Sequence, residues 1–340
     1  MVVLNSRERV LTALDLKIPD RIPYCELEVD EVFSNNLLGI NEKAKPQAGM
    51  NRPIEKEKRI SKALGKDNVI YFFSAPTFCE EGEGKDNRTF YVDGVIKTKN
   101  DLKKVILPNP NRKSLYYEAI DFVKGKEDFA ACVVTNLGID PVIKSIGSIT
   151  FLYALHDNVS LIEDLLSLYV DWEKVVLRNL QNIGFDIIWA ADDFAYNTGL
   201  LFSPEVFRKV VLPQIKETAD CIELPWIYHT DGNIWEIVEE LLDLGMNGLH
   251  PIDPNSMDIF EFKRVYGKRI CLVGNLDVNL LSGNNNEEII SGTTKLINEI
   301  GKDGGYIFSS GNSITSYCKV ENVLLMSDIL RRKGIYDKQR

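Results

Sequence analysis

Residues 225–253 read PWIYHTDGNIWEIVEELLDLGMNGLHPID and contain one complete strand–helix–strand unit. PWIYH (225–229) is a short apolar run typical of a buried strand. NIWEIVEELLDLG (233–245) has the apolar spacing of an amphipathic helix and ends at a glycine, and GLHPI (248–252) marks the next strand. Two strands joined through a helix favour parallel pairing, because an antiparallel pair needs only a tight turn.

The same alternation of strand and helix patterns extends over nearly the whole chain. Eight strand candidates lie near 22–28, 68–74, 129–135, 185–191, 225–229, 247–251, 269–274 and 304–309. Helical patterns alternate with them, so the strands are expected to be parallel and buried on both faces. We therefore predict an α/β fold in which residues 1–340 form a single (β/α)8 TIM-barrel domain with extra N-terminal helices. A doubly wound open sheet is the alternative, although no GxGxxG follows the first strand.

Residues 77–99 interrupt this alternation. They contain a glycine-rich acidic stretch and then short alternating runs around Val92-Asp93-Gly94. Asp-Gly between such runs indicates a hairpin turn. We expect a small hairpin insertion near 77–99 that lies over the barrel mouth. Long helical patterns follow at 141–155 and 159–182.

Composition excludes several classes of partner. Of the 340 residues 44% are hydrophobic and 26% charged, as in a globular protein with a sizeable core. The net charge of −10 disfavours binding to nucleic acid or to an anionic membrane surface. No apolar run reaches the roughly 20 residues that span a bilayer, and the opening MVVLNSRERV lacks the order of a signal peptide. Six scattered cysteines fit a reducing compartment, so we expect a cytoplasmic protein.

Polar residues follow each predicted strand. In chain order they are Glu26 and Glu28; Ser74 and Thr77; Thr135 and Asn136; Asp192 and Asp193; His229, Thr230 and Asp231; His250 and Asp253; Asn275 and Asp277; and Ser309, Ser310 and Asn312. In a barrel these strand ends converge on one mouth, where barrel enzymes keep their chemistry. The pattern predicts an acid-rich pocket. Helix capping, which also recruits Asp, Asn and Ser after strands, remains open for each residue taken singly.

His229 stands out in this set. The chain has three histidines, and two of them, His229 and His250, lie at adjacent strand ends, whereas His156 is in a helical stretch. Asp231 follows His229 by two residues, and this pair could act as metal ligands or as an acid and a base. A purely structural histidine is the alternative.

Several blocks resemble the uroporphyrinogen decarboxylase superfamily. They are HTDGNI, GLHPID, YGKRICLVGNLDVNLL, GGYIFSSGNSI, the opening RERVLTALDLKIPDRIP and DDFAYNTGLLFSPEVFRKVVLP, in consistent order over nearly the whole chain. The resemblance implies a barrel with one of two activities. One is cofactor-free decarboxylation of uroporphyrinogen. The other is zinc-assisted methyl transfer to or from a corrinoid protein in anaerobic metabolism of methanol, methylamines, methyl halides or methoxylated aromatics.

The chain departs from the decarboxylase pattern in two places. Decarboxylases resemble one another in an RQAGR loop whose arginines grip carboxylates, whereas QAG at 47–49 is flanked here by Pro46 and Met50. Their FSD after strand two matches FSA at 73–75, and Ala75 cannot accept hydrogen bonds from pyrrole N–H groups. An acid-rich mouth also repels an octa-acidic substrate.

The chain departs from the thiol-methylating branch as well. Relatives there bind zinc through H-x-C and a later cysteine, and the matching positions here are His229, Asp231 and Asn312. Zinc accepts nitrogen and oxygen ligands, so the resemblance implies a metal site at these three residues. It favours a methyltransferase of the corrinoid-dependent O-demethylase type, which moves a methyl group from a small methylated substrate to a corrinoid protein with zinc assistance.

The remaining roles follow from this interpretation. Candidate catalytic residues are Asp192, Asp193, His250, Glu26 and Glu28, and candidate substrate-binding residues are Asn136, Asn275, Asp277 and Ser310. The expected partners are a small-molecule substrate, a corrinoid protein and, by analogy with other barrels, a second copy of the chain. Two alternatives stay open: a uroporphyrinogen decarboxylase-like lyase, and a non-catalytic barrel that binds a corrinoid or corrinoid protein.

Overall fold

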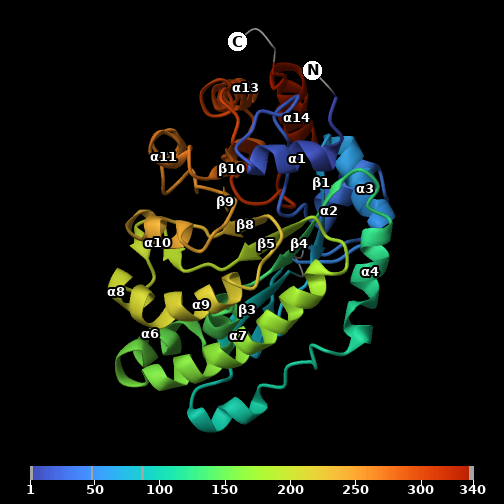
Figure 1. Ribbon diagram of the computed structural model, residues 1–340. Helices are drawn as coiled ribbons and strands as arrows, with labels where there is room; N and C mark the ends of the chain where they lie inside the picture. Colours follow the sequence, from blue (N-terminus) through green and yellow to red (C-terminus); the bar gives the residue numbers. More distant parts are fainter. Residues whose placement is uncertain (1–2, 47–48, 86–87, 337–340) are drawn as a thin grey trace.

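A parallel sheet of seven strands forms the centre of an α/β fold in the computed structural model, which describes residues 3–46, 49–85 and 88–336 (Figure 1). Its strands, in spatial order, are β1 (Asn68–Phe72), β4 (Ala130–Thr135), β5 (Ile187–Ala191), β8 (Trp226–His229), β9 (Gly248–His250), β10 (Cys271–Leu276) and β11 (Tyr306–Ser310). Each coincides with a predicted strand, because short apolar runs buried on both faces carry a strong sequence signal.

The strand predicted near 22–28 is the exception. This segment makes isolated parallel bridges, Tyr24 with Phe308 and Val29 with Ile314, and no continuous ladder. Pro23 has no N–H to donate to a ladder. On the β1 side the Asp67 carboxylate accepts from the Tyr24 N–H at 2.9 Å, so a side chain takes the place of a backbone partner. The segment therefore lies beside β11 and β1 without completing an eighth regular strand.

Alternation along the strands divides the buried apolar residues into two clusters. Those facing the interior of the curved sheet are Cys25, Leu27, Ile70, Ala130, Cys132, Val134, Ile187, Trp189, Ile227, Cys271, Val273 and Ile307. The residues that alternate with them along each strand, such as Tyr228 between Ile227 and His229, point to the other face and pack against the surrounding helices. Since side chains alternate with a period of two, His229 continues the interior row that Ile227 begins. The interior is thus apolar near the strand starts and polar at the strand ends.

Helices surround the sheet and connect consecutive strands (Figure 1). They are α1 (Ser6–Leu14), α2 (Glu31–Leu38), α3 (Ile54–Leu64), α4 (Tyr117–Lys124), α5 (Ile139–Ile146), α6 (Ser148–Asp157), α7 (Val159–Gln181), α8 (Pro204–Val206), α9 (Leu212–Ala219), α10 (Val238–Leu242), α11 (Ile259–Tyr266), α12 (Val278–Ser282), α13 (Asn286–Lys295) and α14 (Val320–Lys333). Short 3-10 turns are η1 (Lys99–Lys104), η2 (Lys113–Tyr116) and η4 (Trp235–Ile237), and π turns are η3 (Phe207–Val211) and η5 (Leu296–Ile300).

The N-terminal helix α1 closes the start of the interior. Its Val10, Ala13 and Leu14 belong to the interior apolar cluster. Asn5 caps the helix by accepting from the Glu8 N–H, and the Glu8 side chain accepts from the Asn5 N–H, which together form a capping box. α1 therefore covers the interior of the sheet at the end where the strands begin.

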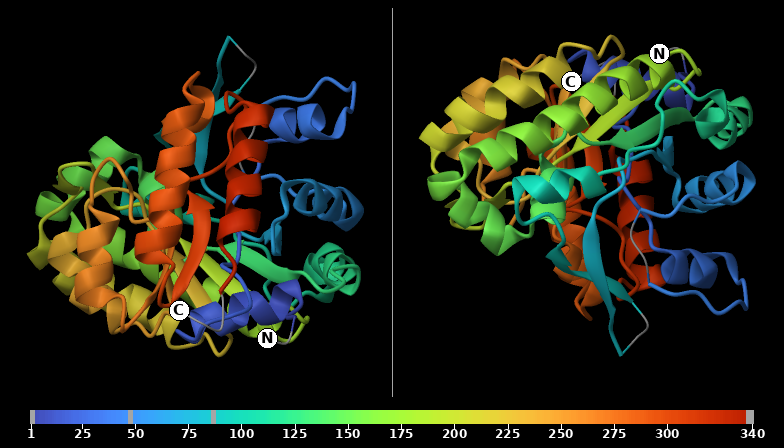
Figure 2. Two further views of the ribbon diagram at one scale, coloured as in Figure 1. Left: turned by 90° about the horizontal axis from the view of Figure 1, so that it is seen from above. Right: turned by 90° about the horizontal axis from the view of Figure 1, so that it is seen from below.

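The predicted hairpin exists, but its turn lies elsewhere. β2 (Cys79–Glu83) pairs antiparallel with β3 (Thr89–Gly94), and the connection runs through residues 84–88, of which 86 and 87 lie outside the described residues. The prediction that Asp93-Gly94 forms the turn was wrong. The hairpin projects from the body of the molecule in both views of Figure 2.

Close packing of β3 explains this difference. A Cβ on Gly94 would lie 2.3 Å from the Ser145 carbonyl oxygen, and one on Gly147 would lie 2.0 Å from an Asp93 carboxylate oxygen. Gly94 is thus required for the contact between β3 and the junction of α5 and α6. The same junction, at Gly147 with φ of 94°, divides the helix predicted over 141–155.

A second two-stranded ribbon, β6 (Ala195–Tyr196) with β7 (Gly199–Leu200), follows β5. All six cysteines are free thiols in the structure. Among the described residues no helix combines the length and the apolar character that a membrane crossing requires.

Candidate active site

Three side chains from neighbouring strand ends form one cluster. His229 is the last residue of β8, Asp193 follows β5, and Asp231 comes two residues after His229. The His229 Nε2 atom lies 3.7 Å from Asp193 Oδ1 and 4.0 Å from Asp231 Oδ1. One ligand atom from each residue lies within 4.8 Å of the others, which is the spacing of groups that share one cation.

Asp231 is the least satisfied member of this cluster. Its Oδ2 accepts from the Asn312 amide at 2.5 Å. Its Oδ1 is buried and has no hydrogen-bond partner in the part of the chain that the structure describes. Burial raises the pKa of Asp231 to about 6. A buried carboxylate oxygen without a donor is unfavourable unless a cation or a ligand occupies the space beside it.

The donor types fit a divalent metal. An imidazole nitrogen and two carboxylates form a set that zinc and similar cations accept. The set differs in one member from the sequence expectation of His229, Asp231 and Asn312. The structure brings Asp193 to the cluster, whereas the Asn312 amide nitrogen donates to Asp231 and so orients that carboxylate.

A second histidine lies directly behind the cluster. His250, the last residue of β9, is fully buried, and its Nδ1 lies 2.7 Å from the Nδ1 of His229. Its ring meets Trp189 edge-on at 5.1 Å between centroids. Burial and the neighbouring His229 hold the pKa of His250 well below its usual value. His250 is therefore neutral and reaches the cluster only through His229.

A cavity of about 610 Å³ opens at the strand ends in front of the cluster. His229, Asp193, Glu28 and Asn136, all predicted as site residues, line it together with the apolar side chains Leu27, Phe72, Ala75, Phe90 and Val134. The hairpin contributes Cys79, Glu81, Thr89, Phe90 and Tyr91, so the insertion forms one wall of the mouth. This arrangement confirms that the hairpin lies over the site.

Glu28 is the lining acid best suited to hold a proton. It accepts from the Gly49 N–H at 2.7 Å. Burial raises the pKa of Glu28 to about 7, against the opposing effects of that hydrogen bond and of Arg52. A carboxyl group with such a pKa is partly protonated near neutral pH, which is the range useful for a general acid.

Glu26 and Asp192 lie behind the cavity wall. The Glu26 carboxylate accepts from the Ser310 N–H at 3.0 Å and from the Ser310 Oγ at 2.6 Å. Asp192 accepts from the backbone N–H groups of Leu137 and Asp140 at 2.8 and 2.9 Å and so caps the segment that leads into α5. Burial raises the pKa of both acids to about 7.

The other candidate substrate-binding residues have partners of their own. Asn275 donates to the Ile252 carbonyl at 2.5 Å, and Asp277 accepts from the Asn279 N–H as the cap of α12. Asn136 lines the cavity and donates to the Ala191 carbonyl. Gln47 and Ala48, compared with the decarboxylase loop, lie outside the described residues.

Two lining residues were missed by the sequence interpretation. Lys144 and Asp140 on α5 form an ion pair at 2.7 Å and both line the cavity. Their spacing of four residues on a helix that follows a strand is a usable signal, but such pairs are common on exposed helix faces. Only its position at the cavity wall distinguishes this one.

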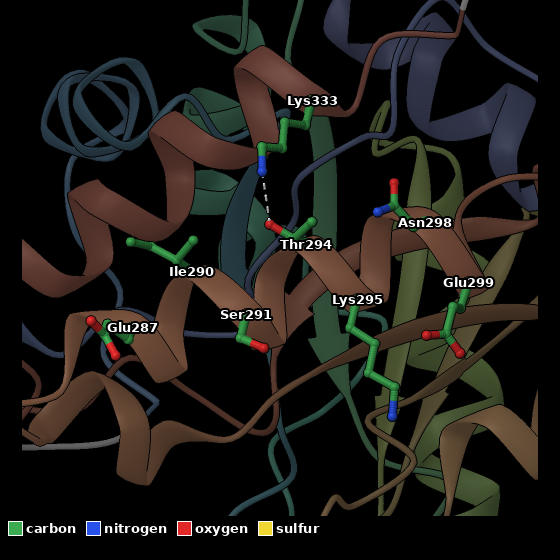
Figure 3. A pocket seen from close by; sticks show the side chains of 8 residues that line it. All are labelled: Glu287, Ile290, Ser291, Thr294, Lys295, Asn298, Glu299 and Lys333. Carbon is green, nitrogen blue, oxygen red and sulfur yellow. Dashed lines mark hydrogen bonds between the residues drawn. The ribbon is translucent and has the colours of Figure 1, made fainter.

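A hollow on the outer helices lacks this chemistry. Figure 3 shows this hollow, which runs along α13 and which Lys333 of α14 borders, with Lys333 donating to Thr294 at 3.1 Å. It lies on the outer helices, away from the strand ends, and contains no residue of the acid and histidine cluster. The mouth cavity therefore remains the candidate active site.

Comparison with known proteins agrees with this architecture. The sequence is 23% identical over 302 residues to uroporphyrinogen decarboxylase of Chlorobium phaeobacteroides, which covers 80% of this chain and 81% of that protein. It is 33% identical over 122 residues to the Pseudomonas fluorescens decarboxylase, 36% of this chain and 33% of that protein.

Solved structures show the same fold. A methyltransferase from Methanosarcina mazei superposes with a TM-score of 0.76 at 19% identity, over 97% of this chain and 99% of that one. A B12-independent methionine synthase from Shewanella sp. W3-18-1 superposes with a TM-score of 0.55 at 14% identity, over 82% and 86%. The sequence model of the family described as uroporphyrinogen decarboxylase (URO-D) matches residues 62–333, and the chain belongs to this family.

Proposed function

We propose that this chain is a methyltransferase of the corrinoid-dependent O-demethylase type, which moves a methyl group from a small methylated substrate to a corrinoid on a separate protein. The observation that carries the proposal is the cluster of Asp193, His229 and Asp231 at the cavity, with one buried oxygen of Asp231 lacking a partner. The likeness in fold to a protein named as a methyltransferase supports the proposal.

Asp193, His229 and Asp231 would hold the metal. Zinc bound there would supply Lewis-acid polarisation of the substrate oxygen. The carboxylates serve a further purpose, because their negative charge offsets that of the cation and keeps the site from attracting unrelated anions. Asn312 keeps the Asp231 carboxylate turned toward His229 by donating to its other oxygen.

Glu28 would supply the proton that the reaction needs. When the methyl–oxygen bond breaks, its electron pair stays on oxygen, and the methyl group leaves to the acceptor. The oxygen then takes a proton, which a neutral carboxyl group can donate. Glu28 lines the same cavity as His229, and its pKa of about 7 leaves a protonated fraction at neutral pH.

The cavity wall fits a small, partly apolar molecule. Phe72 and Phe90 line it beside the acids, and Lys144 already has Asp140 as a partner. Ala75, at the position where decarboxylases carry an aspartate, also lines the cavity and offers no acceptor to a pyrrole N–H. A tetrapyrrole with eight carboxylates would face Glu28, Asp140 and Asp193 at close range, which is unfavourable.

The test combines metal analysis with an assay of methyl transfer. Purified protein is loaded with zinc, and free cob(I)alamin serves as acceptor with methanol or a methoxylated benzoate as donor and a methylamine as the control without a methyl–oxygen bond. We expect about one zinc per chain and methylcobalamin formation with one donor class. His229→Ala should lose both the zinc and the activity, whereas Glu28→Gln should keep the zinc and lose turnover.

Three results would overturn the proposal. The metal role is wrong if wild-type protein binds no zinc, or if its metal content is the same in His229→Ala. Release of CO2 from uroporphyrinogen would replace it by the decarboxylase alternative. Binding of a corrinoid protein that survives His229→Ala and Asp231→Ala, with no methyl transfer in any assay, would favour the non-catalytic alternative.

A further inference from the structure

A buried line of four polar side chains runs from the cluster of Asp193, His229 and Asp231 into the interior of the curved sheet. It begins at His229 Nδ1, which lies 2.7 Å from His250 Nδ1. His250 Nε2 lies 3.4 Å from Ser309 Oγ, and Ser309 Oγ lies 3.3 Å from Glu26 Oε2. None of the four residues is more than 5% exposed. They come from β8, β9, β11 and the N-terminal segment, so four distant parts of the sequence meet in one line.

The far end of this line fixes the direction of its hydrogen bonds. The Ser310 N–H can only donate, and it points at Glu26 Oε1. The hydroxyls of Ser310 and Ser309 both lie against Glu26 Oε2, at 2.6 and 3.3 Å. An ionised Glu26 has no proton to give and accepts from all three. The Ser309 hydroxyl then donates its one proton to Glu26 and can only accept a hydrogen bond from His250.

This constraint determines which ring nitrogen carries the proton in His250 and in His229. If Ser309 accepts, His250 carries a proton on Nε2, and because a second proton would place an unpaired charge on a fully buried ring, its Nδ1 is bare. A contact of 2.7 Å between two ring nitrogens requires one proton between them. That proton belongs to His229 Nδ1. A neutral His229 is then left with a lone pair on Nε2, the nitrogen that faces Asp193 and Asp231.

We propose that His250 is a positioning residue that, together with Ser309 and Glu26, fixes His229 in the tautomer whose Nε2 lone pair points into the acid cluster. The use of that lone pair as a metal ligand rests on the function proposed above, but the tautomer itself does not. The opposite direction would place an N–H at Nε2, and its hydrogen would occupy the space that a cation needs. Partners that fix the tautomer of a ligand histidine typically change metal affinity about 10–100-fold when they are removed.

The chain offers a clean test, because it contains only three histidines. Long-range ¹H–¹⁵N correlation spectra of metal-free protein labelled in its histidines identify the protonated nitrogen of each ring. His156, on α6 and exposed, provides the internal reference. The spectra are recorded at a pH of about 8.5, above the pKa of about 7 of Glu26, so that its carboxylate is ionised. We expect Nδ1–H for His229 and Nε2–H for His250.

Glu26→Gln should reverse the direction of the hydrogen bonds along the line while the side chain keeps nearly the same shape. The Ser310 N–H keeps the amide oxygen of the new side chain at the Oε1 position, so its NH2 group faces the serine hydroxyls. Ser309 then accepts from the amide and donates to His250. We expect the protons on both rings to move, to Nδ1 of His250 and Nε2 of His229. Zinc affinity, measured by competition with a chromophoric chelator, should fall about 10–100-fold.

Ser310→Ala is the matched control. It removes one donor to Glu26 but leaves the line through Ser309, so both tautomers should stay as in the wild type. The inference is overturned if wild-type His229 carries its proton on Nε2, or if Glu26→Gln leaves both rings unchanged. If the tautomers are as expected but no variant binds zinc, the metal-dependent function is wrong while the positioning role of His250 stands.

Discussion

The two ends of the parallel sheet both contain buried acids, but in opposite states. At the end where strands begin, Asp67 accepts from Arg9 Nη1 at 2.7 Å, Arg21 Nη2 at 2.8 Å and the Ser6 hydroxyl at 2.8 Å. At the end where strands finish, Asp231 has one buried oxygen without a hydrogen-bond partner among the described residues. Acids with complete sets of donors support the fold, whereas acids left short of donors mark the place where a ligand is expected.

The difference also appears in the pKa values. Hydrogen bonding and charge from Arg9 hold the pKa of Asp20, at the strand starts, below its ordinary value against the effect of burial. At the strand ends burial dominates and raises the pKa of Asp231 to about 6 and that of Asp192 to about 7. Burial raises the pKa at both ends of the sheet, but at the strand starts the hydrogen bonds and charge of Arg9 on α1 outweigh it.

The largest effect on stability is expected from Asp67→Ala. It removes the fully buried carboxylate that Arg9, Arg21 and Ser6 share, and Arg9 keeps only its ion pair with Asp20. Removing one member of a buried ion pair typically costs about 3–5 kcal/mol in the free energy of unfolding. Urea-induced unfolding measures it, with Asp15→Ala as control because the Asp15–Lys17 pair is exposed. Equal, small effects of the two substitutions would show that the strand-start network does not hold the fold.

Zinc should stabilise the other end. At a free concentration of about 100 times its dissociation constant, a ligand that binds only the folded chain adds about 2.7 kcal/mol. Wild-type protein should show this shift in thermal unfolding, and Asp231→Asn should not. Asp258→Asn is the control, since Asp258 caps α11 outside the cluster and Asn is an equally good cap. A full shift in Asp231→Asn would remove Asp231 from the metal site.

The pH dependence of stability should have opposite signs at the two ends. For Glu26 and Asp192 the folded pKa is about 7, above the ordinary values of 4.5 and 3.8. Between about pH 5 and 7 unfolding therefore releases protons. The free energy of unfolding should fall by about 1.4 kcal/mol per pH unit for each group as pH rises, and this stabilisation is lost above the folded pKa. Glu26→Gln should remove its share of the slope.

Asp20 behaves in the reverse way. Its folded pKa is lowered, so its stabilising effect is complete above its ordinary value of 3.8 and is lost as pH falls through the folded pKa. Denaturant titrations at several pH values measure the free energy of unfolding in both pH ranges, the acidic one for Asp20 and the near-neutral one for Glu26 and Asp192. A free energy of unfolding that is flat or rising between about pH 5 and 7 would contradict the raised pKa values at the strand ends.

The sequence predicted the sheet well because its signal is local. Strands such as β4 and β8 are short apolar runs next to amphipathic helices, and burial on both faces leaves little freedom for another interpretation. The segment at 22–28 is largely buried as well, but it contains Pro23, Glu26 and Glu28. It fails as a strand because Asp67 and Asn68, more than forty residues away, supply side-chain partners in place of a ladder. Pro23 is a local signal against a ladder, but no local pattern shows that Asp67 and Asn68 lie beside this segment.

The sequence predicted where the site lies, but not which of its acidic residues line the cavity. His229, Asp193 and Glu28 reach the cavity as their strand-end positions suggest. Their neighbours Asp192 and Glu26 do not, because Asp192 accepts from the backbone amides of Leu137 and Asp140, and Glu26 accepts from Ser309 and Ser310. Which acid of each pair is free depends on three-dimensional contacts that only the structure shows.

The smallest effect on stability is expected from Lys144→Met. The Lys144–Asp140 pair resembles the Arg9–Asp67 pair in distance, 2.7 Å in both, but the Lys144 side chain is 47% exposed and that of Arg9 only 6%. An exposed pair four residues apart on a helix typically contributes about 0.3–0.5 kcal/mol. Arg9→Met, the matched substitution at the other end, should cost several times more. If Lys144→Met proves equally costly, the mouth is held by ion pairs like the opposite end, and the contrast between a structural end and a functional end is wrong.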